Sequence, residues 1–148
     1  MNAVLCLTTL LAVIYLSEAT PSGYNQELIA SITECMKKYG LGKDEVVTVM
    51  KTYTPPADKE KECAVGCVME KLGFIKDVTM IWDVVKASNP DRYDTPENVE
   101  KANQVVDACA KIVSGKGTDL CELGVKGITC LRDQTEKAQL QFPHFSFE

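Results

Sequence analysis

The chain has 148 residues, a formal net charge of −5 and an isoelectric point of about 5.0. This acidic balance, without any basic cluster larger than pairs such as Lys37-Lys38, argues against a nucleic-acid partner. Beyond the N-terminal twenty residues no stretch is long and apolar enough to cross a bilayer, so stable membrane insertion is not expected.

The N-terminus predicts a signal peptide over residues 1–19. Residues 3–16 form a run of apolar and hydroxyl residues that is too short to span a membrane, and Ser17 and Ala19 place small side chains at the −3 and −1 positions of a cleavage site. Cleavage after Ala19 removes Cys6 and leaves residues 20–148, which is the size of one domain.

Turn residues divide the first half of this mature chain into three helical segments. Apolar residues recur three and four positions apart over residues 25–39, which predicts a first helix that Gly40 ends. A short second helix contains residues 46–50, and a third begins at residue 57 or 58 and runs to Leu72.

The second half predicts three more helices, the first of them over residues 76–87. A threonine cap followed by proline predicts a fifth helix from Thr95 to Ser114. A sixth begins at residue 118 or 119 and runs to residue 137, where Gly124 and Gly127 either weaken it or permit a close helix contact. Because the strand signal is poor throughout, we expect an all-α fold.

Six cysteines remain in the mature chain with the spacing C-x27-C-x3-C-x41-C-x11-C-x8-C. An even number in a secreted domain of this size predicts three disulfides, whereas a zinc site would need other spacing and more than the single His144. Cys63 and Cys67 lie four apart on one helix, with β-carbons about 5–6 Å apart, which is too far for a bond to each other. The spacing leaves about twelve of the fifteen pairings open.

A helical secreted chain with this spacing resembles the insect odorant-binding proteins of the six-cysteine type, the pheromone and general odorant-binding family. The C-x3-C and C-x8-C intervals are the family's most specific marks, and the resemblance covers the whole mature chain. It implies a compact array of about six helices around an apolar cavity, stapled by the interlocked pairs Cys35–Cys67, Cys63–Cys121 and Cys109–Cys130.

The resemblance also implies a function. The protein would be secreted into sensillum lymph or another body fluid, bind small hydrophobic odorants or pheromones, and ferry them to a chemosensory receptor as a monomer or weak homodimer. It implies a C-terminus that folds over the pocket mouth, so we interpret Phe142, Phe145 and Phe147 as a lid; the alternative is a frayed terminus. A single histidine, His144, predicts at most a weak pH-driven release.

A cavity of about 300 Å3 would cost about 7 kcal/mol, which three disulfides of about 3–4 kcal/mol each would offset. Tyr39, Tyr53 and Thr79 are candidate donors to a polar group on the ligand. Each apolar candidate for the cavity wall is equally compatible with plain core packing. The candidates are Ile32, Met36, Met69, Leu72, Phe74, Val78, Met80, Ile81, Trp82, Val85, Val106, Val113, Ile128 and Leu131.

We expect no enzyme activity, no cofactor and no metal. The only histidine lies in the tail, no GxSxG, HExxH or EF-hand motif occurs, and disulfide-bonded cysteines offer no thiolate. Two alternatives stay open. One is a non-olfactory carrier of lipids, hormones or amines in haemolymph, saliva or reproductive fluid, and the other is an interaction protein whose tail aromatics contact a receptor or a second copy.

Overall fold

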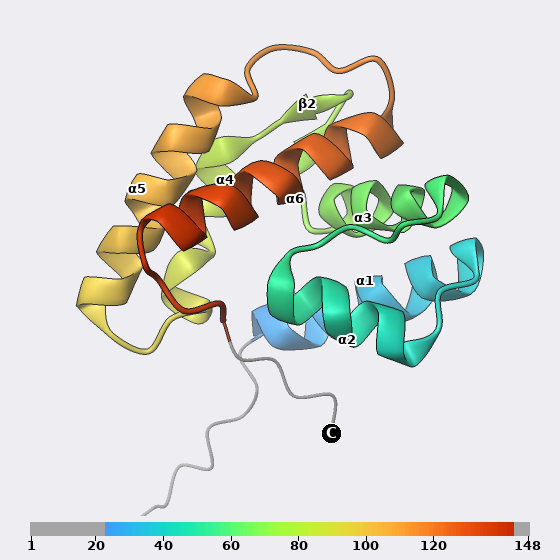
Figure 1. Ribbon diagram of the computed structural model, residues 1–148, viewed down its shortest axis with the longest axis horizontal. Helices are drawn as coiled ribbons and strands as arrows, with labels where there is room; N and C mark the ends of the chain where they lie inside the picture. The colour runs from blue at the N-terminus through green and yellow to red at the C-terminus, as the bar shows by residue number, and fades with distance from the viewer. Residues whose placement is uncertain (1–22, 144–148) are drawn as a thin grey trace, which may run out of the picture.

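A computed structural model describes residues 23–143 (Figure 1). The predicted signal peptide and residues 144–148 lie outside this range. The described chain forms six α-helices, one 3-10 turn and a two-residue-per-strand hairpin, which confirms the expected all-α fold class. The elements are α1 Gly23–Tyr39, α2 Lys43–Thr52, α3 Lys59–Lys71, β1 Ile75–Lys76, β2 Thr79–Met80, α4 Trp82–Ala87, η1 Asn89–Asp91, α5 Pro96–Ile112 and α6 Leu120–Lys137.

Side-chain caps set where three of the long helices begin. Asp58 accepts a hydrogen bond from the backbone N–H of Glu60 before α3, and Thr95 accepts one from the N–H of Asn98 before α5. Asp119 does the same before α6. Each bond satisfies a backbone donor that has no partner within its own helix. The third, fifth and sixth helices therefore begin within about two residues of their predicted starts. Their ends, and both bounds of the first helix, also lie within about two residues of the prediction.

The predicted helix over residues 76–87 is wrong in its first half. Residues 75–80 form an antiparallel hairpin in which Ile75 lies opposite Met80, and the helix begins only at Trp82. Asp77 and Val78 make the turn with φ of 51° and 56°, the left-handed backbone that a two-residue hairpin requires. Tertiary packing explains the difference, because the hairpin buries the side chains of Ile75 and Met80 in the core.

Helices α3 and α6 cross at unusually short range because two glycines face each other there. A Cβ atom added to Gly124 would lie 2.5 Å from the Cα atom of Gly66, and one added to Gly66 would lie 2.2 Å from the carbonyl oxygen of Leu120. The Cys63–Cys121 disulfide closes the same crossing, with its Cα atoms 4.1 Å apart. Gly124 thus permits the close helix contact that the sequence left open.

Two further disulfides tie the remaining long helices to this pair. Cys35–Cys67 joins α1 to α3, and Cys109–Cys130 joins α5 to α6. All three bonds are the pairs that the family resemblance implies. Two apolar clusters fill the interior, a larger one around α3, α5, α6 and the hairpin and a smaller one between α1 and α2. Tyr24 and Leu72 pack against both clusters, and the candidate site lies between them.

Candidate functional site

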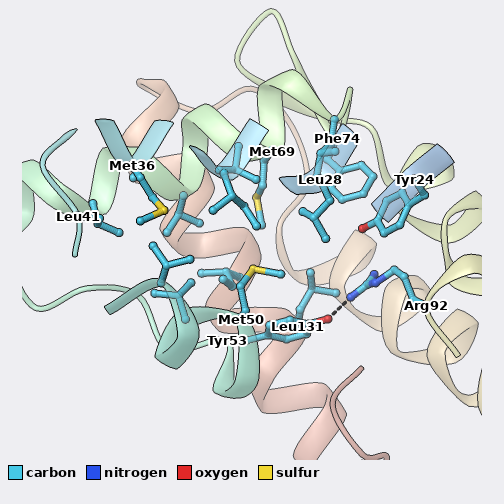
Figure 2. A pocket seen from close by; sticks show the side chains of 18 residues that line it. Tyr24, Leu28, Met36, Leu41, Met50, Tyr53, Met69, Phe74, Arg92 and Leu131 are labelled. Carbon is cyan, nitrogen blue, oxygen red and sulfur yellow. Dashed lines mark hydrogen bonds between the residues drawn. The ribbon is translucent and has the colours of Figure 1, made fainter. Parts of the chain in front are cut away.

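An apolar cavity lies where α1, α2, α3 and α6 meet, as Figure 2 shows. Its volume is about 90 Å3, so its cost at 24 cal/mol per Å3 is only about 2 kcal/mol. This is well below the expected 300 Å3. All but three of the lining side chains are apolar. The wall consists of Tyr24, Leu28, Ile32, Met36, Leu41, Val46, Val49, Met50, Tyr53, Ala64, Val65, Val68, Met69, Leu72, Phe74, Arg92, Ile128 and Leu131.

Half of the candidate wall residues lie in this wall. They come from α1, α3, the loop that follows it, and α6. They are Ile32, Met36, Met69, Leu72, Phe74, Ile128 and Leu131. The cavity wall contains three methionines, Met36, Met50 and Met69, and their flexible, polarizable side chains adapt to guests of different shape.

The other seven candidates do not line the cavity, because the hairpin, the start of α4 and α5 place them in or against the larger apolar cluster or beside it. Met80, Val85 and Val106 are buried in the larger apolar cluster. Val78, Trp82 and Val113 pack against its edge, and Ile81 is half-buried just before α4. The Trp82 indole Nε1 donates a hydrogen bond to the carbonyl oxygen of Val113 at 2.9 Å, which holds the ring against the end of α5.

Helix α2 supplies wall residues that were not among the candidates. Val46, Val49 and Met50 line the cavity, and their spacing of three and four is visible in the sequence. The helix is short, and apart from Val47 its other residues are polar or charged, so the sequence alone is compatible with a surface helix that packs only modestly. Glu45 fixes the start of α2, because its carboxylate accepts hydrogen bonds from the Gly42 backbone N–H at 2.8 Å and from Lys61 Nζ at 2.9 Å.

One end of the cavity is polar, and it is formed by Tyr24, Tyr53 and Arg92. The Arg92 guanidinium donates to the Tyr53 hydroxyl, as the dashed line in Figure 2 marks. Burial raises the pKa of the Tyr24 hydroxyl, although the Arg92 charge opposes that shift. Of the three residues expected to supply a polar contact, Tyr53 lies in the wall, whereas Tyr39 and Thr79 do not.

The chain beyond α6 packs next to this polar end. The Phe142 ring meets the Tyr53 ring edge to face, with centroids 5.0 Å apart, and both Leu140 and Pro143 are buried. Phe142 therefore supports a cavity wall residue from behind. Phe145 and Phe147, the other two residues of the expected lid, and His144 lie outside the described residues.

Residues 23–143 contain neither a metal-binding cluster nor a membrane-spanning helix. Nowhere in that range do three or more histidine, cysteine, aspartate or glutamate side chains gather closely enough to hold a metal ion. None of the helices described there has the length and apolar character needed to cross a bilayer.

Six helices, three disulfides and an apolar cavity between α1, α2, α3 and α6 define a small, disulfide-bonded binding protein. Residues 18–134 match the PBP/GOBP family, and the chain belongs to this family of pheromone and general odorant-binding proteins. It is a family of carriers of small ligands rather than of enzymes.

Solved structures share the fold at low sequence identity. An odorant-binding protein of Drosophila melanogaster is 21% identical, with a TM-score of 0.67 over 82% of this chain and 99% of that one. Odorant binding protein 5 of Apis mellifera is 18% identical, with a TM-score of 0.63 over 78% and 91%. A fatty acid binding protein from the oral disk of the blowfly Phormia regina is 19% identical, with a TM-score of 0.56 over 80% and 96%. No curated protein sequence matches the chain.

Proposed function

We propose that this protein is a secreted carrier that binds small hydrophobic odorants or pheromones in its internal cavity and ferries them through aqueous lymph to chemosensory receptors. The cavity between α1, α2, α3 and α6 carries the proposal. Its wall is apolar except at one end, so transfer of an apolar guest from water is favoured by about 25 cal/mol for each Å2 buried.

The cavity must enlarge to admit such a guest, because ligand pockets usually measure about 300–1,000 Å3 and this one measures about 90 Å3. Its methionine side chains have several rotatable bonds and can rearrange at low cost. The disulfides hold α3 to α1 and to α6, whereas no disulfide reaches α2. We infer that α2 moves outward when a ligand enters.

The tail supports a related proposal, that residues after α6 act as a lid. Phe142 packs on Tyr53 and thereby covers the outer side of the cavity wall. Loss of that contact would let the Tyr53 ring swing and open a path for the guest. Phe145 and Phe147 would extend the lid.

Secretion is supported by the predicted signal peptide and by three disulfides, which form and persist in oxidising compartments. Likeness to two structures named as odorant-binding proteins favours the olfactory role. The likeness to a fatty acid binding protein of an oral disk favours the second candidate, a carrier of lipids in a fluid other than sensillum lymph.

Two experiments separate these roles. Competition of a bound fluorescent dye against panels of volatiles and of lipids would rank the ligand classes that the oxidised protein accepts. Immunolocalisation would then show the compartment. Staining of sensillum lymph with displacement by volatiles supports the olfactory carrier, whereas staining confined to saliva, haemolymph or reproductive fluid contradicts it.

A further inference from the structure

The cavity holds a cationic side chain whose hydrogen-bonding capacity is only partly used. Arg92 follows η1 and is half-buried, with its Nε atom fully buried and without a hydrogen-bond partner. One terminal nitrogen donates to the Tyr53 hydroxyl, and the other lies 3.4 Å from the Asn89 side-chain oxygen, near the limit of a hydrogen bond. A guanidinium has five N–H donors, and most of these have no acceptor here.

No carboxylate neutralises this charge within residues 23–143. None of the six ion pairs in that range includes Arg92. The neighbouring Asp91 is exposed. Asn89 is buried and fixed by its own hydrogen bond to Asn103 at 2.9 Å, so it offers Arg92 a neutral oxygen only.

The aromatic side chains around Arg92 are neutral as well. Burial raises the pKa of Tyr24 and of Tyr93, so both remain protonated phenols at neutral pH. The Arg92 guanidinium carbon lies 5.8 Å from the Tyr53 ring centroid and 5.9 Å from that of Tyr93, which gives it a weak attraction to their faces. A charge in such surroundings lacks the paired partner that buried cations normally have.

We propose that the missing partner is the ligand, and that the protein prefers guests with one carboxylate at the end of an apolar chain. The carboxylate would accept hydrogen bonds from Arg92, and the chain would run between α1 and α2 toward Met36 and Leu41, which Figure 2 places at the far end of the cavity. One guanidinium matches one monovalent head group. This inference rests on the proposed carrier function and assigns its ligand class.

The test compares three ligands that share one apolar tail: laurate, methyl laurate and 1-dodecanol. Each competes at neutral pH with a fluorescent dye bound to the oxidised protein, the Arg92→Met variant and the Lys86→Met variant. Methionine keeps the apolar stem of either cation. Lys86 is the matched control because it is a half-exposed cation that lies outside the cavity wall and pairs with Asp107. Both variants remove one positive charge, so they have the same net charge.

We expect the unmodified protein to bind laurate at least about tenfold more tightly than methyl laurate, since a hydrogen-bonded charge pair is worth about ten- to hundredfold. Arg92→Met should remove that preference by weakening laurate at least about tenfold more than it weakens methyl laurate or dodecanol, and Lys86→Met should keep the preference. Equal binding of acid and ester by the unmodified protein would overturn the inference while leaving the carrier function intact. The inference is also overturned, and the carrier function kept, if Arg92→Met weakens the binding of all three ligands alike. If none of the three ligands displaces the dye, the inference is overturned, whereas the carrier function fails only if the dye itself shows no saturable binding.

Discussion

Replacing Gly124 by alanine tests the packing that positions the cavity. Alanine favours a helix interior by about 1 kcal/mol over glycine, so helix propensity alone predicts a more stable protein. The structure predicts the opposite. The new Cβ would lie 2.5 Å from both the Cα and the N atom of Gly66, and these are backbone atoms that cannot rotate away.

The size of the effect follows from that distance. Ordinary contacts of a Cβ atom begin near 3.4 Å, so α3 and α6 would have to separate by about 1 Å at their crossing. The Cys63–Cys121 disulfide resists this movement because it joins the two helices at the same place. Overpacking costs about 1–3 kcal/mol, and a clash with backbone atoms belongs at the upper end of that range. After the propensity gain of about 1 kcal/mol we expect a net loss of about 2 kcal/mol.

Thermal unfolding followed by circular dichroism measures this loss, which corresponds to a fall in Tm of roughly 6–10 °C for a domain of this size. Gly127→Ala is the matched control on the same helix. Its Cβ would lie 3.2 Å from the Sδ and Cε atoms of Met80 and 3.6 Å from the Sδ atom of Met69, and both of these flexible side chains can move. We expect that variant to equal or exceed the wild type in stability. A Gly124→Ala protein as stable as the wild type would refute the close crossing.

Three other variants test the lid, the core and the start of α2. Phe142→Ala should speed ligand release several-fold in stopped-flow displacement, and an unchanged off-rate would count against the lid. Trp82→Phe should cost about 1 kcal/mol of stability through its lost indole hydrogen bond and leave ligand affinity unchanged, whereas weaker binding would place this ring at the site. Hydrogen bonds from the Gly42 N–H and Lys61 lower the pKa of Glu45. Its carboxylate therefore stabilises the fold fully above the unfolded pKa, which is about 4.3. This stabilisation is lost as the pH falls through the lower folded pKa. The stability gap between the wild type and Glu45→Gln should therefore close in denaturant titrations as the pH falls below the unfolded pKa and through the lower folded pKa. A gap that persists at still lower pH would contradict this.

The sequence predicts helices well where local chemistry decides their ends. Thr95 and Asp119 cap helices with their own side chains, and such signals act over a few residues. Such local signals do not predict the hairpin at residues 75–80. A two-residue turn of its type favours glycine or asparagine, but here it contains Val78 at φ 56°, a conformation that a β-branched residue adopts only when its surroundings impose it. Those surroundings include the hydrogen bond from the Gly117 N–H to the Val78 carbonyl oxygen, between residues far apart in sequence.

The sequence predicted the kind of site, an apolar cavity, but only half of the candidate wall residues line it. Helical periodicity marks Ile32, Met69 and Leu131 as inward-facing, and all three line the cavity. Periodicity does not say which of two apolar clusters a residue joins, so Val85 and other residues of the α4–α5 region were equally good candidates. Arg92 gave no signal at all, because it lies outside any regular helix and only the folded chain directs it toward the cavity.

The location of bound ligand tests the central claim most directly. We would label the methionine methyl groups with carbon-13 and record two-dimensional NMR spectra while titrating the oxidised protein with an apolar naphthylamine dye. Met36, Met50 and Met69 line the cavity, whereas Met80 packs beside Gly127 outside it. The account predicts saturable one-to-one shifts of the first three methyl signals, with Met80 changing least. Saturation without movement of those three signals, or no saturable binding at all, would contradict a carrier that holds its ligand in this cavity.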